Sequence, residues 1–316
     1  MDIKHVLVTG GSGLVGKAIE NISLDPQYSN YHFHYVSSSM CDLTCKIQTE
    51  KLFSTIKPKY VIHLAARVGG LFRNMREKVE MLEDNVAINL NVLSMCHAFN
   101  VEKCVSCLST CIFPDKTTYP IDETMLHDGA PHNSNDAYAY AKRLVDVQSR
   151  AYREQYGRNF ITVVPTNIYG PHDNYSLDDG HVIPSLIHKC YIATRDGKPL
   201  KLIGSGSALR QFIYSDDLAR LMIWALENYN DSSPIILSPN PESDVEIRDV
   251  ASLIAKSFGN KNGLHITHTG NDGQHRKTAN NAKLMSRIGD FNFTSMEDGI
   301  KKSVAWFIKN YDISRK

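Results

Sequence analysis

Residues 6–16 read VLVTGGSGLVG, and this stretch decides the fold. Val6–Val8 is a strand-like apolar run, and the glycines of Thr9–Gly16 satisfy both G-x-x-G-x-x-G and G-x-G-x-x-G. Glycine permits a tight turn and lets the backbone approach a pyrophosphate at the N-terminus of the next helix. A glycine motif alone is weak evidence, and a purely structural turn is the alternative. The strand-loop-helix context nevertheless favours dinucleotide binding.

Apolar runs and amphipathic stretches alternate over the first 170 residues. We expect strands at Val6–Thr9, Phe33–Ser37, Tyr60–Leu64, Lys103–Leu108 and Ile161–Val164, and helices at Gly13–Ile22, Lys46–Ile56, Lys78–Phe99 and Ala137–Tyr156. This alternation predicts an α/β fold with a doubly wound parallel sheet of the Rossmann type. Asp115–Asp136 has turn residues and no clear period, which predicts a long loop over the strand ends.

The pattern changes after Pro165. We expect helices at His181–Ala193, Ser215–Glu227 and near Glu297–Asn310, and strands at Lys201–Ile203, Gln211–Ile213 and Ile235–Leu237. Residues 1–170, with about 211–238, are expected to form the dinucleotide-binding domain. Residues 171–210 and 239–316 are expected to form a smaller, partly interleaved substrate-binding lobe.

Composition excludes several classes of protein. The 316 residues fit one large domain or two closely packed ones, and 42% hydrophobic with 22% charged residues is ordinary for a globular chain. Basic and acidic residues number 35 and 34, so neither a nucleic acid nor a membrane surface is an expected partner. The N-terminus lacks a signal-like apolar segment, and no apolar run reaches the roughly 18 residues of a membrane span. We therefore expect a cytoplasmic protein.

Seven cysteines suit a reducing compartment if all are thiols. Cys104 and Cys107 form a C-x-x-C pattern, which could be a redox pair or half of a zinc site. Positions three apart on a strand point to opposite faces of the sheet, and no second pair follows at zinc-finger spacing. We expect two buried thiols and no metal site.

The end of the second predicted strand bears on the choice of cofactor. An NAD site usually has an acidic residue there, which binds the ribose 2′-hydroxyl. This chain has Val36 followed by three serines, and its first acid is Asp42. A 2′-phosphate meets no repulsion here, so the sequence favours NADP, although no nearby arginine selects it. Asp42 either serves the adenine end or caps the following turn.

A Tyr and a Lys four residues apart, Tyr138 and Lys142, lie on one face of a predicted helix. There the ammonium is expected to lower the pKa of the phenol and ready it for proton transfer. Ser109 lies at the carboxyl end of a predicted strand, where such folds place their crevice, and Cys111 adds a thiol. A surface pair on an amphipathic helix is the alternative; Tyr140 should point away.

Several motifs together resemble the extended short-chain dehydrogenase/reductases. They are Thr9–Gly16, His63–Ala66, Ser109, Tyr138-x-x-x-Lys142 and Pro165–Pro171. More narrowly, Leu108–Pro114, Pro165–Asn174, Gly180–Pro184 and Asp272-Gly273 are similar to the GDP-L-fucose synthase branch. The resemblance extends from Val6 to about Asn310. It implies 3,5-epimerisation and NADPH-dependent 4-reduction of GDP-4-keto-6-deoxy-D-mannose.

The resemblance also implies roles for five residues. Tyr138 would protonate the C4 oxygen, while Lys142 lowers its pKa and holds the nicotinamide ribose. Ser109 would bind the keto oxygen and stabilise the enolate of the epimerisation. Cys111 and His181 match the base and the acid of that step, and both titrate near neutrality.

The implied binding residues fall into two sets. The cofactor set is Gly10, Gly11, Ser12, Gly13, Leu14, Val15, Gly16, Ser37, Ser38, Asp42, Ala65, Leu108, Tyr138, Lys142, Pro165, Asn167, Ile168 and His181, and the substrate set is Asn167, Lys189, Arg210, Asp272 and Lys277. The family often has Arg where this chain has Lys189. A lysine cannot make the bidentate contact with phosphate that an arginine guanidinium makes. Ile203 replaces a common Trp, so stacking on the substrate is lost.

Other readings remain open. A nucleotide-sugar 4-epimerase or 4,6-dehydratase would share the fold, but dehydratases place an acidic pair where this chain has Cys111-Ile112. A non-catalytic NADP-binding regulator would not need Tyr138 and Lys142. The resemblance further implies a homodimer, through a four-helix bundle of Lys78–Phe99 and Ala137–Tyr156.

Overall fold

The computed structural model describes residues 3–268 and 276–316 and is built on a six-stranded sheet of order β10-β5-β4-β3-β1-β2. The strands are β1 (Lys4–Thr9), β2 (Tyr31–Val36), β3 (Tyr60–His63), β4 (Lys103–Cys107), β5 (Asn159–Pro165) and β10 (Ile235–Leu237). All neighbouring strands pair in parallel. The chain runs from β1 outward to β2 and then returns to β3 on the other side of β1. This reversal confirms the predicted doubly wound sheet.

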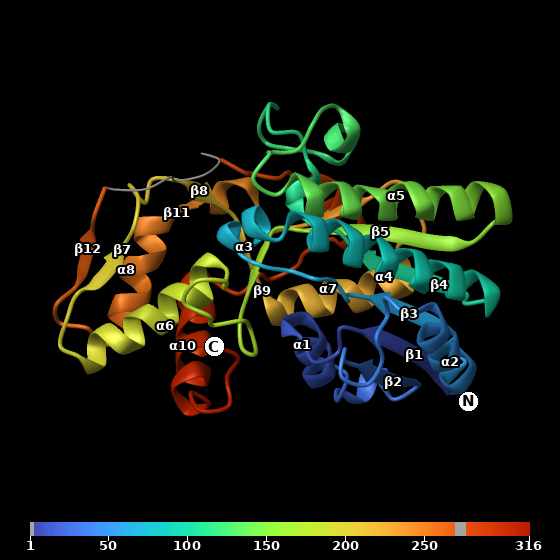
Figure 1. Cartoon of the computed structure of the whole chain (residues 1–316), viewed down its shortest axis with the longest axis horizontal. Helices are drawn as coiled ribbons and strands as arrows, with labels where there is room; N and C mark the ends of the chain where they lie inside the picture. The colour runs from blue at the N-terminus through green and yellow to red at the C-terminus, as the bar shows by residue number, and fades with distance from the viewer. Residues whose placement is uncertain (1–2, 269–275) are drawn as a thin grey trace.

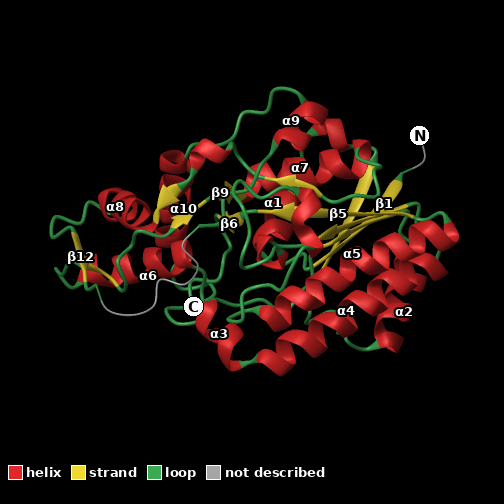
Figure 2. Cartoon of the chain, turned by 90° about the horizontal axis from the view of Figure 1, so that it is seen from above, coloured by secondary structure: helices red, strands yellow, loops and turns green. Residues whose placement is uncertain are grey.

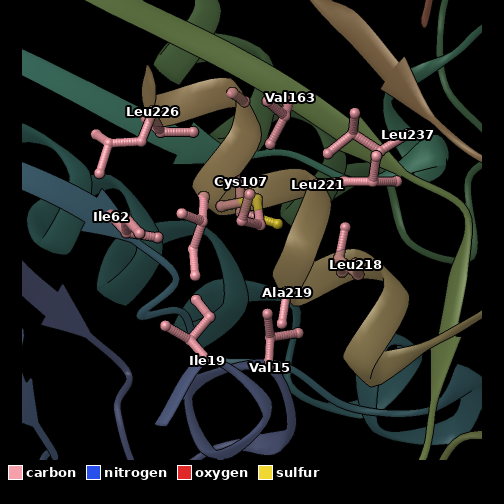
Figure 3. Close-up of a cluster of buried hydrophobic side chains, with 14 of the residues drawn as sticks. Val15, Ile19, Ile62, Cys107, Val163, Leu218, Ala219, Leu221, Leu226 and Leu237 are labelled. Carbon is pink, nitrogen blue, oxygen red and sulfur yellow. The ribbon is translucent and has the colours of Figure 1, made fainter. Parts of the chain in front are cut away.

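Helices cover both faces of this sheet (Figure 2). α1 (Leu14–Ile22) and α7 (Ser215–Asn228) pack on one face, whereas α2 (Lys46–Ile56), α4 (Lys78–Ala98) and α5 (Asp136–Tyr156) pack on the other. Strands buried on both faces need apolar side chains at successive positions, which explains their continuous hydrophobic runs. Figure 3 shows the core beneath α1 and α7.

The two cysteines of the C-x-x-C pattern lie in different cores. Cys104 is buried on the face covered by α4 and α5. Cys107 is buried on the α7 side and is labelled in Figure 3. The prediction that they are buried thiols on opposite faces is confirmed, since both are free.

A third core lies at the far end of the molecule (Figure 1). It is formed by α6 (Val182–Arg195), α8 (Ile247–Ser257) and α10 (Met296–Lys309), with β7 (Leu200–Leu202) paired to β12 (Leu264–Ile266). Two short pairs connect this end to the sheet: β6 (Asn167–Tyr169) runs parallel to β9 (Phe212–Tyr214), and β8 (Leu209–Arg210) antiparallel to β11 (Val245–Glu246). These pairs continue the chain from β5 and lead it into α7.

Some elements were not predicted. α3 (Leu71–Arg76), α8 and α9 (Ala282–Ile288) are additional helices, and the predicted loop Asp115–Asp136 contains a 3₁₀ turn at Glu123–His127. α8 buries Val250 and Ala251 with Ile254 and Ala255, so its apolar positions do recur with helical spacing. Within the described residues, no helix is both long enough and apolar enough to cross a membrane.

Candidate active site

The loop between β1 and α1 depends on its glycines. A Cβ atom on Gly11 would lie 2.7 Å from Tyr35 Cα, and one on Gly16 would lie 2.6 Å from the Gly10 carbonyl oxygen. Gly10 has a φ of +72°, which side chains disfavour. The helix begins after Gly13 with no side-chain cap and no acid in its first turn. Its backbone N–H groups can therefore bind an anion, as a dinucleotide pyrophosphate requires.

The loop after β2 holds the other predicted cofactor contacts. The hydroxyl groups of Ser37 and Ser39 form a hydrogen bond of 2.7 Å. Asp42 Oδ1 accepts hydrogen bonds from the Thr44 backbone N–H at 2.9 Å and from the Thr44 hydroxyl at 2.7 Å. Asp42 thus caps the turn, which was one of its two predicted roles. No carboxylate precedes it in the loop, so the predicted tolerance of a 2′-phosphate fits the structure.

A directed chain of hydrogen bonds connects the glycine loop to α5. Thr9 Oγ1 accepts from the Ala65 backbone N–H at 3.2 Å and contacts His63 Nδ1 at 2.8 Å. His63 Nε2 contacts Asn89 Oδ1 at 3.0 Å, and Asn89 Nδ2 donates to the Ala141 carbonyl at 3.4 Å. Because Asn89 Oδ1 can only accept, His63 carries its proton on Nε2, and Thr9 donates to Nδ1. A neutral imidazole therefore joins β1 to the helix of Tyr138 and Lys142.

Ser109 and Cys111 lie on a single turn at the end of β4. Ser109 Oγ caps the 3₁₀ turn Thr110–Ile112 by accepting from the Cys111 N–H at 3.4 Å. Lys142 on α5 is buried and donates from Nζ to the Cys107 carbonyl at 2.9 Å. Its Nζ lies 5.9 Å from the centre of the Tyr138 ring. The strand end and the helix thus present hydroxyl, thiol and phenol to one space.

That space is a cavity of about 1070 Å³ beside the strand ends. The predicted residues that line it are Ser109, Cys111, Tyr138, Asn167, His181, Lys189, Arg210 and Lys277. Lys142 does not line it. Asp272 is outside the described residues. Residues from the turn after β4 and from α5, β6, α6, β8 and the C-terminal segment therefore converge on one cavity, whereas exposed Tyr140 does not line it.

His181 is placed by a close approach of two loops. It directly precedes α6 as its N-cap residue. The Gly70 N–H donates to the Asp179 carbonyl at 2.9 Å, and a Cβ on Gly70 would lie 2.6 Å from the Gly180 carbonyl oxygen. Arg76 holds the Asp179 carboxylate at 3.1 Å. The loop that precedes α3 therefore fixes the segment from which His181 faces the cavity.

Burial changes the acidity of the reactive groups. It raises the pKa of Tyr138 well above its ordinary value, and the neighbouring thiols of Cys111 and Cys107 act in the same direction. The predicted lowering by Lys142 is not found, because burial dominates the pKa of Tyr138 and the ammonium donates to the Cys107 carbonyl. Burial also raises the pKa of Cys111, against the Ser109 hydrogen bond and the charges of Lys277 and Lys142. Burial lowers the pKa of His181.

The polar residues of the cavity that were not predicted include Asn74, His132, Ser134 and Asn135. His132 Nδ1 accepts from the Ser134 backbone N–H at 3.2 Å, so its ring proton, when neutral, resides on Nε2. Asn74 donates from Nδ2 to the carbonyls of Gly69 and Gly70 at 2.7 and 3.0 Å. The sequence signal for His132, Ser134 and Asn135 was their position three to six residues before Tyr138.

Comparisons with known proteins agree with this geometry. Residues 6–237 match the model of the NAD dependent epimerase/dehydratase family. The chain is 57% identical to the GDP-L-fucose synthase of Dictyostelium discoideum over 99% of its length and 98% of the relative. It is 50% identical to a probable GDP-L-fucose synthase of Drosophila melanogaster, covering 99% of this chain and all of the relative. A solved GDP-L-fucose synthetase of Naegleria fowleri bound to NADP superposes with a TM-score of 0.95 at 44% identity, covering 100% of this chain and 96% of that one.

Proposed function

The chain belongs to the NAD-dependent epimerase/dehydratase family, within its group of GDP-L-fucose synthases, and we propose that it makes GDP-L-fucose from GDP-4-keto-6-deoxy-D-mannose. The cofactor is NADP(H). One observation carries the proposal: a single cavity joins a reductase pair, Ser109 and Tyr138, to a second acid-base pair, Cys111 and His181. Reduction alone would not need the second pair.

The reductase step uses groups at the ends of β4 and α5. Bound NADPH supplies the hydride that reduces C4. Tyr138 is protonated at neutral pH because its pKa is raised, so it can donate a proton to the C4 oxygen. Ser109 offers its hydroxyl to the same oxygen. Lys142 keeps two further N–H donors beyond its bond to the Cys107 carbonyl, and these suit the ribose hydroxyls of the cofactor.

The epimerase step uses the thiol and the imidazole. Inversion at C3 and at C5 next to a ketone needs a base on one face of the sugar and an acid on the other. Cys111 is the proposed base, and cations near it, Lys277 and Lys142, favour its thiolate. His181 is the proposed acid, held in the lining of the same cavity by the loop before α6. Ser109 stabilises the enolate oxygen, so it serves both steps.

The nucleotide end of the substrate meets cations. Lys189, Arg210 and Lys277 line the cavity and are the proposed partners of the diphosphate. Asn167 donates from Nδ2 to the Gln211 carbonyl at 2.8 Å, so its Oδ1 and its second N–H are the groups it can offer to the sugar or cofactor. Asp272 remains a proposed contact by resemblance.

The test is incubation of the protein with NADPH and GDP-4-keto-6-deoxy-D-mannose, with identification of the product sugar. We expect GDP-L-fucose and one NADPH oxidised for each sugar converted. A 4-epimerase or 4,6-dehydratase would regenerate its cofactor, so turnover without net NADPH oxidation would contradict the proposal. Cofactor binding without turnover would indicate a regulator.

We also propose a homodimer through α4 and α5. These helices lie side by side and leave apolar side chains in solvent: Val79, Leu82 and Leu90 on α4, and Tyr140, Leu144 and Val147 on α5. Spacings of three, four and eight residues put each set on one helix face. Such a continuous apolar surface fits a second copy of the same helix pair, which would form a four-helix bundle.

We also propose a division into two domains and a cytoplasmic location. The division into a dinucleotide-binding domain (1–170 with about 211–238) and a substrate lobe (171–210 and 239–316) is supported by the separate cores on the sheet and around α6, α8 and α10. A cytoplasmic location is supported by seven free cysteines.

A further inference from the structure

The turn that carries Ser109 and Cys111 is held at both ends by consecutive residues of α5. Lys142 Nζ donates to the Cys107 carbonyl before the turn at 2.9 Å. Arg143 Nε donates to the Ile112 carbonyl at the end of the turn at 2.6 Å. Successive helical residues point about 100° apart, so one helix can reach both ends of so short a segment. The two contacts fix the turn against the helix of Tyr138.

Arg143 is an unusual residue for this place. Its side chain is 8% exposed, and an arginine is rarely so buried without a carboxylate. Within the described residues it forms no ion pair, and one of its terminal nitrogens, Nη2, is buried without a hydrogen-bond partner. Its guanidinium also stacks 5.6 Å from the centre of the exposed Tyr140 ring. Burial of an uncompensated cation costs stability, which suggests a functional reason for retaining it.

We propose that Arg143 is a positioning residue for epimerisation, which holds the Cys111 turn against α5 so that the thiol meets the carbon acids of the substrate. The inference rests on the proposed function, because it assigns Arg143 to the epimerase step. Arg143 does not line the cavity, so it acts through the Ile112 carbonyl rather than on the substrate.

The charge of Arg143 supplements the tether. Groups that face Cys111 are Tyr138, Lys142 and Arg143 from α5, Ser109 from its own turn, and Lys277 from the C-terminal segment. The raised pKa of Tyr138 keeps its phenol protonated, and Lys142, Lys277 and Arg143 are basic groups whose positive forms attract a thiolate. Arg143 therefore adds to a cationic environment that opposes the effect of burial on the Cys111 thiol.

Two variants separate tether from charge. Arg143→Met removes both, and Arg143→Lys retains the charge without the planar donor that reaches Ile112. We expect both to slow solvent-deuterium exchange into the keto sugar, measured without NADPH, by about ten-fold or more, because misplacing a reacting group by ~1 Å can cost ~100-fold. With NADPH, 4-reduction should persist and yield more sugar that is not inverted at C3 and C5.

Alkylation of Cys111 by iodoacetamide supplies a readout that needs no substrate. The rate is followed against pH by mass spectrometry of the Cys111 peptide. Arg143→Met should move the midpoint of this profile upward by about one pH unit, whereas Arg143→Lys should keep it close to wild type. Arg150→Met is the matched control on α5. Arg150 does not line the cavity, and its Nε forms an ion pair with Asp146 Oδ2 at 3.0 Å. It should change neither readout.

Two results would overturn the proposal. In the first, Arg143→Lys exchanges deuterium at the wild-type rate and Arg143→Met leaves the alkylation profile unchanged. In the second, exchange and reduction fall equally with the melting temperature, as a general loss of structure would produce. The wild-type protein could instead fail to convert the keto sugar while Arg143→Met still shifts the pH profile of Cys111 alkylation. In that case the proposed function would fail and the link between Arg143 and the thiol would stand.

Discussion

Burial favours the neutral form of every proposed acid and base in the cavity. It raises the pKa values of Tyr138 and Cys111 and lowers that of His181. Tyr138 is therefore ready to donate a proton, as reduction at C4 requires. Cys111 must lose a proton before it can act as a base, and His181 must gain one before it can act as an acid. The basic groups near the thiol should therefore affect the rate of proton exchange more than the rate of hydride transfer. A bound substrate that excludes water should do the same.

Cys111→Ser should separate the two activities. A serine hydroxyl is a much weaker acid than a thiol, so deuterium exchange at C3 and C5 should fall by about 10²-fold or more, while NADPH oxidation persists. Mass spectrometry of the sugar after reaction in deuterium oxide measures the exchange. Cys45→Ser is the control, because Cys45 lies outside the cavity. Unchanged exchange in Cys111→Ser would show that another group is the base.

Ile203 is a residue-scale departure with a measurable consequence. It lines the cavity and is 68% exposed, so its side chain has room for a larger ring. Ile203→Trp should lower the KM for the GDP-sugar by about three- to ten-fold, because aromatic stacking adds ~0.5–1.5 kcal/mol. The kcat should change little, since Ile203 follows β7, a different element from the turn that carries Ser109 and Cys111. A KM equal to or above that of wild type would contradict a stacking role at this position.

At the scale of elements, the chain from Thr9 through His63 and Asn89 makes β1, β3, α4 and α5 one unit. The cofactor loop begins after Thr9, and Ala141 lies on the turn between Tyr138 and Lys142. The distance between the cofactor loop and the proton donor is therefore set by buried hydrogen bonds. Burial, with a smaller effect of Lys142, lowers the pKa of His63 to about 3.

This low pKa predicts a loss of stability in acid. The folded-state pKa of His63 lies below the ordinary value of 6.5, so its neutral form stabilises the fold fully above pH ~6.5 and progressively less as pH falls toward 3. From pH 6.5 to 4.5 this one group should cost ~2–3 kcal/mol of unfolding free energy. His63→Asn should be less stable at pH 7 but lose less on acidification. Urea unfolding at several pH values measures both slopes; equal slopes would refute the assignment.

Most elements of the central sheet and its covering helices were predictable from sequence, whereas α3, α8, α9 and the short strands β6, β8, β11 and β12 were not. α2 and β10 match their predicted bounds, and α4, α5 and α7 differ by one residue at an end. α3 spans only Leu71–Arg76, too short for a period to emerge, and β8 has two residues. Their positions depend on tertiary contacts such as Gly70 against Gly180.

In the site, motifs identified residues, whereas their contacts and pKa shifts depended on the fold. Motifs located Ser109, Tyr138 and Lys142, but the direction of the Tyr138 pKa shift required the burial that only the fold supplies. Arg143 is likewise adjacent to a motif residue, and nothing in the sequence indicates that its guanidinium reaches Ile112.

At the scale of the whole molecule, the apolar surface of α4 and α5 should control assembly. Leu144→Glu places a charge in its middle and should convert a dimer into a monomer of 35.5 kDa. Light scattering after size exclusion measures the mass. Ser54→Glu, which adds the same charge on the exposed face of α2, should remain dimeric. A wild-type monomer, or a dimer that tolerates Leu144→Glu, would contradict the proposed interface.

We propose that one cavity performs proton exchange and hydride transfer on the same sugar. This proposal is tested most directly by running the wild-type reaction in deuterium oxide with unlabelled NADPH and locating deuterium in the product by NMR. We predict deuterium at C3 and at C5, protium from NADPH at C4, and one NADPH oxidised per product sugar. A product reduced at C4 with protium retained at C3 and C5 would contradict the account, because the cavity would then contain only a reductase.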